Sequence, residues 1–495
     1  MSDRARKLDM RLLEFAVLLA CLTTSSVTAA ADRLPNIVIF LADDLGAHDL
    51  GCTGSTFYET PHLDRLASQG ARFTQGYAAC PVCSPSRASL MTGKWPVRTL
   101  VTDYIGAAQP EKWNRNTKLL PATYQTFLDL NETTLAEVCK SAGYATMHAG
   151  KWHLGPEPNW PEHQGFDVNK GGHSAGGPYG PGKYFSPYGN PRLEDGPIGE
   201  HLPDRLAREC SKFIEENKDR PFYVNFWTYD VHTPLVARKD LQTKYEAKRK
   251  KLGLEPQYGR EGLRDVRLVQ EHAAYAAMVE AMDDAVGQVL KTLDRLNLAD
   301  NTLVIFTSDN GGLSTSEGWP TSNLPLRGGK GWLYEGGIRV PLIVRWPGFA
   351  KPGSVIDAPA VTPDLFATVA SAIGKPTPSD GIDLAPVLKG QQPPERALYW
   401  HYPHYGNQGG SPGSAIRVGS HKLIAWEEGG IELFDLASDP GETQPLKDDG
   451  VMSGLIEKLI LWKEETGAKT PAPNPKFDPA KPDGRGTKNP TDKAS

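Results

Sequence analysis

The sequence predicts an α/β fold in which helices sandwich a large, mostly parallel or mixed central sheet, followed by a small antiparallel C-terminal subdomain. Two apolar runs rich in β-branched residues, 36–42 (NIVIFLA) and 301–307 (NTLVIFT), are typical of fully buried strands. Residues 273–296 and 134–142 place apolar side chains at helical spacing. Strands that alternate with helices favour a sheet covered by helices.

The remaining elements follow the same reasoning along the chain. Residues 222–229 predict a third strand of the sheet, and 202–217 and 363–373 predict further helices. Beyond the segment 390–394 (GQQPP) the predicted elements become short: strands at 397–401, 414–418, 421–426 and 431–435, and a helix at 451–465.

Length and composition suggest how these elements are divided between domains. A chain of 495 residues suits one large domain with a smaller one. We assign the main domain to residues 33–391 and the C-terminal subdomain to 392–469. Residues 470–495 are rich in Pro, Lys and Asp and have few apolar side chains, so we predict a disordered tail.

The N-terminus has the features of an export signal. Basic residues precede the apolar stretch 12–22, and small residues lead to 29–31 (AAA). The apolar stretch is too short for a membrane span, so we expect a signal peptide at 1–31 and a soluble periplasmic or secreted protein. Two alternatives stay open: a retained anchor, and lipid anchoring through Cys21, where 18–21 (LLAC) loosely resembles a lipoprotein cleavage box.

Charge and cysteine content limit the classes of partner. The net charge of −5 and the pI near 6.2 give no basic surface for nucleic acid, so we expect no nucleic-acid partner. The spacing of Cys52, Cys80, Cys139 and Cys210 forms no metal-ligand pattern, and their disulfide pairing stays open.

Residues 83–93 (CSPSRASLMTG) form the most informative motif. Cys83 is followed by a proline and by Arg87, which does not suit a simple reactive thiol, since such a thiol needs a nearby histidine or a helix N-terminus. A dithiol formed by Cys80 and Cys83 is the competing interpretation, but it leaves the Pro-Ser-Arg sequence unexplained.

Further motifs occur in a fixed order along residues 33–345. They are Asp43-Asp44, 150–155 (GKWHLG), 230–234 (DVHTP), 308–312 (SDNGG), 327–331 (RGGKG) and 335–341 (EGGIRVP). With the Cys83 motif, this set resembles the type I, formylglycine-dependent sulfatases, arylsulfatase-like members of the alkaline phosphatase superfamily. The resemblance implies that 33–391 is a sulfatase catalytic domain, and that a maturation enzyme oxidises Cys83 to a formylglycine aldehyde.

A metal site is expected where two strands end. Asp43, Asp44, Asp309 and Asn310 offer only oxygen ligands, which suits a hard divalent cation rather than zinc. Ligands in open α/β sheets lie at the carboxyl ends of the strands, so both pairs should meet at one edge. The resemblance implies Ca²⁺, or Mg²⁺, with an oxygen of modified Cys83 as a further ligand.

The resemblance also assigns catalytic roles. A hydrated aldehyde at Cys83 carries two hydroxyls, of which one attacks sulfur and the other later expels sulfate. Arg87, one helical turn beyond, can donate to an oxygen on that residue. Lys151 and His153 are expected beside the formylglycine, with His153 as the base, and His232 and Lys330 on the leaving-group side.

The predicted activity is therefore hydrolysis of a sulfate ester, with a sulfated carbohydrate or an aryl sulfate as substrate. Two alternatives stay open: a phosphonate or phosphate monoester hydrolase of the same superfamily, and an inactive protein that binds sulfated glycans. The glycine-rich segment 327–331 lacks P-loop spacing, so we exclude nucleotide binding.

Two long Gly-, Pro- and Tyr-rich segments, 103–127 and 155–199, are predicted to be surface loops that shape substrate access or only connect elements. Six aromatic or imidazole side chains are candidates for packing against a sugar ring: Trp95, Trp160, Tyr179, Tyr184, His401 and His404.

Overall fold

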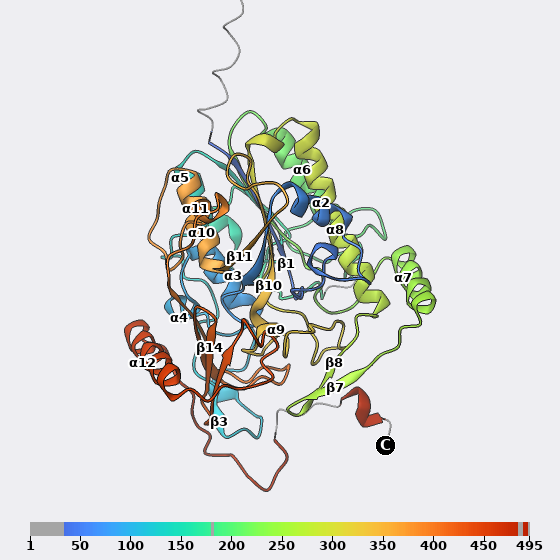
Figure 1. Cartoon of the computed structure of the whole chain (residues 1–495). Coiled ribbons are helices and arrows are strands. Elements are labelled where there is room, and N and C mark those ends of the chain that lie inside the picture. The colour runs from blue at the N-terminus through green and yellow to red at the C-terminus, as the bar shows by residue number, and fades with distance from the viewer. Residues whose placement is uncertain (1–33, 180–182, 484–488, 494–495) are drawn as a thin grey trace, which may run out of the picture.

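The computed structural model describes residues 34–179, 183–483 and 489–493, so the expected signal peptide and Cys21 lie outside the described residues. A mixed sheet of eight strands forms the centre, in the order β11-β2-β10-β9-β1-β6-β4-β5 (Figure 1). Its strands are β1 (Asn36–Ala42), β2 (Ala71–Tyr77), β4 (Ala145–Gly150), β5 (Val168–Lys170), β6 (Phe222–Trp227), β9 (Thr302–Ser308), β10 (Arg339–Arg345) and β11 (Ser354–Val361). β1 pairs in parallel with β6 and β9, whereas β10 runs antiparallel to β9 and β2. The predicted large mixed sheet is confirmed.

Helices cover both faces of this sheet (Figure 1). Successive side chains of a strand point to opposite faces, and in the central strands the side chains on both faces are apolar, so each face needs a cover. Val38 and Phe40 of β1 belong to the core shared with α2 (Pro61–Gln69), α6 (Leu202–Glu216) and α8 (Ala273–Arg295). Ile37 and Ile39 belong to the core on the other face, which is shared with α3 (Cys83–Thr92), α5 (Leu135–Ser141), α10 (Thr362–Ala372) and α11 (Ala385–Leu388).

The C-terminal subdomain is a four-stranded antiparallel sheet with one helix, as predicted. Its elements are β12 (Ala397–Tyr402), β13 (Gly413–Val418), β14 (His421–Trp426), β15 (Ile431–Asp435) and α12 (Asp449–Thr466). Lys422 of β14 is fully buried, with Nζ 3.0 Å from Glu335 Oε1 and 2.8 Å from Glu442 Oε1. Since Glu335 begins α9 (Glu335–Ile338), this buried ion cluster joins the subdomain to the main domain.

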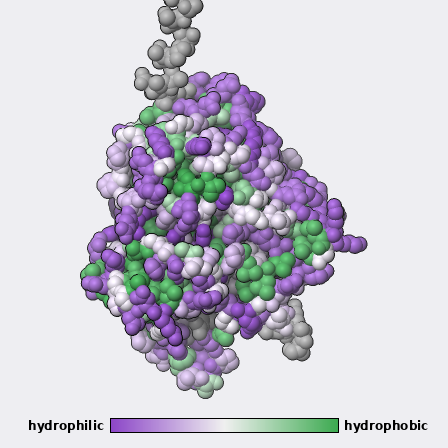
Figure 2. Space-filling model, viewed as in Figure 1, coloured by the Kyte–Doolittle hydropathy of each residue, from purple (hydrophilic) through white to green (hydrophobic). Residues whose placement is uncertain are grey.

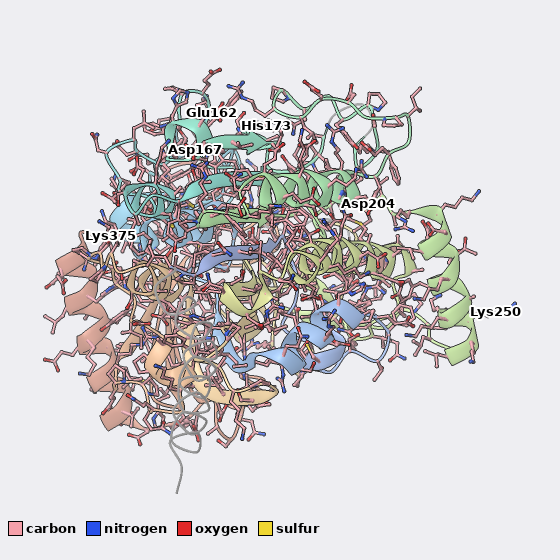
Figure 3. All side chains as sticks on the ribbon, turned by 90° about the horizontal axis from the view of Figure 1, so that it is seen from above. Glu162, Asp167, His173, Asp204, Lys250 and Lys375 are labelled. Atoms are coloured by element: carbon pink, nitrogen blue, oxygen red, sulfur yellow. The ribbon has the colours of Figure 1, made fainter. Side chains whose placement is uncertain are left out.

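Shorter elements fill the connections. They are α4 (Pro96–Thr99), α7 (Lys239–Leu252), the hairpin of β7 (Tyr258–Glu261) and β8 (Arg264–Arg267), and the 3-10 turns η1 (Gly51–Thr53), η2 (Pro110–Lys112), η3 (Pro161–His163), η4 (Ala299–Asn301) and η5 (Pro490–Lys493). Seen from above, Glu162, Asp167 and His173 lie near one another at one edge of the molecule, and Lys250 of α7 lies at another side (Figure 3).

The segment beyond residue 470 differs from the predicted disordered tail in its described parts. β16 (Ala472–Pro473) pairs with β3 (Leu119–Leu120), and Asn474 Nδ2 donates to the Thr117 carbonyl at 2.8 Å. Thr491 Oγ1 donates to Asp265 Oδ2 at 2.8 Å. Composition underestimated the order here, because hydrogen bonds to the main domain, rather than apolar burial, hold these residues.

The surface is largely hydrophilic, with separate hydrophobic patches on the face seen in Figure 2. Within the described part of the chain, no helix has the length and apolar character needed to cross a membrane.

Asp283 of α8 holds the first turn of α2, and its ionisation should make the stability of the fold depend on pH. Its carboxylate accepts hydrogen bonds from the backbone N–H groups of His62 at 3.0 Å and Leu63 at 2.7 Å, in the first turn of α2. Burial raises the pKa of Asp283 to about 7. An unfolded chain ionises this carboxyl near its ordinary value of 3.8, so between that pH and about 7 the folded state holds an extra proton.

We therefore expect the contribution of Asp283 to stability to fall as the pH rises from about 4 to about 7, and then to level off. The measurement is the melting temperature of the wild type minus that of Asp283→Asn, recorded across this range. Because asparagine does not titrate, a difference that stays constant or grows with pH would contradict the raised pKa.

Candidate active site

Two polar pairs lie side by side where two neighbouring parallel strands end. Asp43 and Asp44 follow β1, and Asp309 and Asn310 follow β9. Asn310 Nδ2 donates to Asp44 Oδ1 at 2.8 Å, and the backbone N–H of Asp44 donates to Asp309 Oδ1 at 3.3 Å. All four side chains are buried. The structure thus brings together four of the five residues predicted as metal ligands, the fifth being modified Cys83.

The next strands and the glycine-rich loop bring cations and a histidine to the same place. Lys151, directly after β4, donates from Nζ to Asp43 Oδ2 at 2.6 Å. Lys330 Nζ lies 2.8 Å from Asp44 Oδ1. His232, beyond the end of β6, has Nε2 3.8 Å from Asp44 Oδ2. The carboxylates are therefore surrounded by positive or ionisable nitrogen groups.

Cys83 is the first residue of α3, and its sulfur lies 3.4 Å from His153 Nδ1. Arg87, one turn further along α3, is fully buried and donates from Nε to Asp309 Oδ2 at 2.8 Å and from Nη1 to the Lys151 carbonyl at 3.0 Å. These bonds tie α3 to the ends of β9 and β4. A hydrogen bond from Arg87 to an oxygen on residue 83 stays a prediction.

Acidic and basic side chains are paired at this site. Three buried carboxylates face three buried cations: Asp43, Asp44 and Asp309 face Arg87, Lys151 and Lys330. Burial raises the pKa of Asp43. Burial also acts against the charge of Asp44, but Lys330 and His232 lower the pKa of Asp44 overall. Burial likewise opposes the charge of Lys330, yet Asp44 raises its pKa overall, so this ion pair is stable.

The side chains present fit a hard divalent cation. Asp43 Oδ1 and Asn310 Oδ1 are buried, and neither has a hydrogen-bond partner among the described residues. Asp43, Asp44 and His232 each present a ligand atom within 4.8 Å of the others. A buried oxygen without a partner is costly in a protein interior, and a cation of the Ca²⁺ or Mg²⁺ type would satisfy it.

Hydrogen bonds define the tautomers of the two histidines. His153 Nε2 lies 2.8 Å from the Ile105 carbonyl, which can only accept, so Nε2 carries the proton and Nδ1 presents a lone pair to Cys83. His232 Nδ1 lies 2.6 Å from the Thr233 carbonyl, so Nδ1 is protonated and Nε2 is the free nitrogen.

Both imidazoles are held neutral by their surroundings. Burial, and then the charge of Lys151, lower the pKa of His153 well below its ordinary value. Burial, and then Lys330, lower the pKa of His232 to about 3. His153 is therefore neutral, with the Nδ1 lone pair facing residue 83.

A cavity of about 360 Å³ opens onto these groups. Cys83, His153, His232 and Lys330 line its inner part. Its remaining lining residues are Tyr104, Ile105, Gly176, Tyr179, Glu317, Asn407 and Gln408. Both long segments, 103–127 and 155–199, thus reach the cavity, as one of their two interpretations anticipated. Asp43, Asp44, Arg87, Lys151, Asp309 and Asn310 lie behind this lining.

Much of the outer wall of the cavity was not predicted from the sequence. Tyr104, Glu317, Asn407 and Gln408 lie in irregular segments that carry no periodic pattern. Of the six side chains proposed for sugar packing, only Tyr179 is among the described lining residues. Four of the others are buried: Trp95, Tyr184, His401 and His404. His404, for example, bonds through Nε2 to Thr102 Oγ1 at 2.9 Å.

The cysteines within the described residues are free thiols: Cys52, Cys80, Cys83, Cys139 and Cys210. Cys80 and Cys83 are therefore not joined in a disulfide. Ser86, between Cys83 and Arg87, instead links α3 to the preceding turn, because its Oγ donates to the Cys80 carbonyl at 3.0 Å and accepts from the Cys80 N–H at 3.1 Å.

Comparison with known proteins places this chain in a family. The sulfatase family model matches residues 35–375, and the model of the N-sulphoglucosamine sulphohydrolase C-terminal region matches residues 329–466. A sulfatase of Formosa agariphila is 30% identical, with 93% of this chain and 94% of the relative covered. The N-acetylgalactosamine-6-sulfatase of Canis lupus familiaris is 33% identical, with 87% and 85% covered.

A solved structure gives the same result. The crystal structure of Ps i-CgsB in complex with k-i-k-neocarrahexaose superposes with a TM-score of 0.72 at 26% identity, covering 88% of this chain and 94% of that one. The family model spans well over half of the 495 residues. The chain therefore belongs to the sulfatase family.

Proposed function

We propose that this sulfatase removes sulfate from a sulfated carbohydrate by means of a formylglycine at position 83 and a bound Ca²⁺, with Mg²⁺ as the alternative ion. The observation that carries the proposal is the arrangement around the cavity. Cys83 faces the lone pair of His153 Nδ1, and Lys330 and His232 line the same cavity. This proximity supports roles for Cys83 as the source of the nucleophile, for His153 as the base, and for Lys330 and His232 at the leaving oxygen.

Cys83 itself does not suit a thiolate mechanism. Burial raises the pKa of its thiol, although Lys151 and Lys330 act in the opposite direction. An aldehyde formed from this side chain supplies, once hydrated, one hydroxyl to attack sulfur and a second to release sulfate. Conversion requires a maturation enzyme as a partner of the newly made chain.

His153 is proposed as the base that takes a proton from residue 83. Its Nε2–H is held by the Ile105 carbonyl, and Ser84 Oγ, 3.3 Å from Nδ1, borders the other side of the ring. Ser84 Oγ also donates to the His153 carbonyl at 2.9 Å. The ring is therefore fixed in the orientation and tautomer that proton transfer needs.

Lys330 and His232 are proposed to act on the leaving alcohol. Lys330 keeps its proton, because Asp44 raises its pKa overall against the effect of burial. An ammonium group at this position stabilises negative charge that develops on the ester oxygen. Arg87 and Lys151 are proposed to position residue 83 and the carboxylates.

Asp43, Asp44, Asp309, Asn310 and modified residue 83 are proposed to hold the cation. When bound, it neutralises the carboxylates and draws electron density from the sulfate oxygens. Arg87, Lys151 and Lys330 already pair with the carboxylates, so an added divalent ion would make the site more positive and attractive to an anionic sulfate ester.

Metal removal tests this assignment. A chelator is expected to lower both activity and melting temperature, and Ca²⁺ to restore both, because an ion that binds only the folded state stabilises it. Asn310→Ala should lose the Ca²⁺-dependent rise in melting temperature, whereas Asn301→Ala, in η4 and outside the site, should keep it. Full activity in protein shown by elemental analysis to be metal-free would contradict the proposal.

A carbohydrate substrate is supported by relatives named for sugar sulfates, such as the N-acetylgalactosamine-6-sulfatase, and by the oligosaccharide complex of the similar structure. Export to the periplasm or beyond is proposed from residues 1–31, in which basic residues precede an apolar stretch and small residues follow it.

Comparing the hydrolysis rates of sulfate and phosphorus esters tests the proposed function against the two alternatives. Matured enzyme is expected to hydrolyse nitrophenyl sulfate and at least one sulfated mono- or oligosaccharide, and to hydrolyse nitrophenyl phosphate and phosphonate esters far more slowly. Preferred hydrolysis of the phosphorus esters would favour the phosphonate or phosphate monoester hydrolase. Binding of sulfated sugars with no turnover would favour the inactive glycan-binding protein.

A further inference from the structure

The outer wall of the cavity carries a negative charge in an unusual backbone conformation. Glu317 is the only acidic side chain among the described lining residues, and Lys330 is the only lysine or arginine among them. Glu317 has φ of 52°, in the left-handed region that non-glycine residues rarely adopt. Residues held in this way are often found where a side chain must be presented to a ligand.

Neighbouring segments hold the turn that carries Glu317. The Trp319 backbone N–H donates to the Ser316 carbonyl at 2.8 Å, and its indole Nε1 donates to the Asp265 carbonyl at 2.8 Å. Thr315 Oγ1 donates to the Gln408 carbonyl at 2.9 Å. The position of Glu317 is thus fixed from both sides before any ligand binds.

Two hydrogen bonds orient the carboxylate of Glu317 and leave some of its acceptor positions without a donor among the described residues. Gln408 Nε2 donates to Oε1 at 2.7 Å, and Thr233 Oγ1 lies 3.4 Å from Oε2. A carboxylate offers about four acceptor positions, so others stay available to donors in the cavity. Since Thr233 directly follows His232, Glu317 lies on the leaving-group side of the cavity.

Apart from Lys330, whose ammonium interacts with the Glu317 carboxylate, the amide and phenol side chains beside Glu317 in the cavity are uncharged and amphipathic. Asn407 Nδ2 donates to the Tyr104 hydroxyl at 2.8 Å, and Tyr179, 62% exposed, stands edge-on to His232 with ring centroids 6.4 Å apart. Amide and phenol groups suit hydroxyls, and an exposed aromatic face suits the C–H face of a pyranose. A carboxylate here accepts hydrogen bonds from hydroxyls and repels a second anion.

Resting on the proposed function, we propose that Glu317 is a specificity-determining residue that selects a substrate whose leaving sugar ring is neutral. A hydroxyl of that ring donates to the Glu317 carboxylate, while Tyr179 packs against the ring. Rings with a carboxylate, as in uronic acids, or with a second sulfate near the scissile ester, are disfavoured. Glu317 thus attracts neutral rings through a hydrogen bond and repels rings that carry a carboxylate or a second sulfate.

The test compares matched sugar sulfates. The probes are glucose against glucuronic acid and galactose against galacturonic acid, each pair sulfated at the same ring carbon, and a monosulfated hexose against its disulfated form. The wild type is expected to show higher kcat/KM for the neutral member. Glu317→Gln should lower kcat/KM for the neutral sugar roughly 10- to 100-fold, mainly through KM, because it replaces a charged acceptor by a neutral one.

The ratio of kcat/KM between neutral and anionic sugars shows whether Glu317→Gln changes substrate recognition or only lowers activity in general. In Glu317→Gln the ratio of kcat/KM between neutral and anionic members should fall toward unity, whereas Glu464→Gln, an exposed change of equal charge on α12, should keep the wild-type ratio. A readout independent of turnover is the dissociation constant of the same probes for Cys83→Ala with and without Glu317→Gln. It should show the same loss of preference.

The outcomes distinguish this inference from the proposed function. Equal use of neutral and anionic sugars by the wild type, or an unchanged ratio in Glu317→Gln, would overturn the role of Glu317 while the sulfatase activity stands. Failure of the matured wild type to hydrolyse any sulfate ester, nitrophenyl sulfate included, would overturn the proposed function and this inference together.

Discussion

Cys83→Ala is expected to abolish turnover while the protein keeps its fold. The proposed nucleophile is made from this side chain, so kcat/KM for nitrophenyl sulfate should fall on the order of 10⁴- to 10⁶-fold. The fold should survive, because the sulfur lines the cavity and its contact is with His153 rather than with a sealed core. Steady-state kinetics and the melting temperature measure the two parts of this prediction.

Cys52→Ala serves as the control. Cys52 lies in η1 and is only partly buried, and it is not among the lining residues of the cavity. We expect it to keep wild-type kinetics. If Cys83→Ala kept the turnover rate of the wild type, residue 83 would not be the nucleophile. If Cys52→Ala lost activity as well, the loss in Cys83→Ala would not be specific to position 83.

The second large effect separates the two halves of the catalytic cycle. His153 is proposed to act after the alcohol has left, since its Nδ1 faces residue 83. His153→Ala should therefore release about one equivalent of nitrophenol rapidly and then nearly stop, with a steady-state rate lower by roughly 10²- to 10⁴-fold. Rapid-mixing absorbance gives the burst, and mass spectrometry should detect sulfate retained on the protein.

His232→Ala should behave differently, because His232 is proposed to act on the leaving group. The burst should be lost, and the rate defect should be smaller for nitrophenyl sulfate than for a sugar sulfate, whose alkoxide needs more stabilisation. Exposed His163, in η3, provides the control: His163→Ala should resemble the wild type on both substrates. Equal defects on good and poor leaving groups in both variants, with no retained sulfate, would contradict this division of roles.

The fold could be predicted because its central strands and helices have strong patterns. β1 is buried at every position and apolar from Ile37 to Ala42, which occurs where both faces of a strand are covered. Thr134 and Glu137 form a capping box at the start of α5, and the helix lies where the sequence placed it. The contacts of the tail could not be predicted, because Asn474 and Thr491 are held by partners distant in sequence.

The clustering of part of the inner site could be predicted because these residues follow strand ends, whereas Cys83, Arg87 and Lys330 were named from the family motifs. Parallel pairing of β1 with β9 and β6 brings Asp44, Asp309 and His232 to one edge, whatever the intervening loops contain. Glu317 and Gln408 could not be found in this way. Their proximity depends on a turn with positive φ and on a loop of the C-terminal subdomain, neither of which has a periodic signal.

His404 was proposed from the sequence as a sugar contact because aromatic residues surround it in the chain. Its side chain is instead buried. Its ring packs edge-on against Tyr124 and Tyr402, with centroids 5.7 Å and 5.4 Å away. Composition alone does not separate an aromatic side chain that fills the core from one that lines a cavity.

The central claim is that residue 83 acts as an aldehyde, and the direct measurement is peptide mass spectrometry of active enzyme produced together with a maturation enzyme. We expect the peptide that contains Cys83 to be lighter by the mass difference between a thiol and an aldehyde side chain, in a fraction that rises in proportion to specific activity. Active protein in which Cys83 is entirely unmodified would contradict the mechanism.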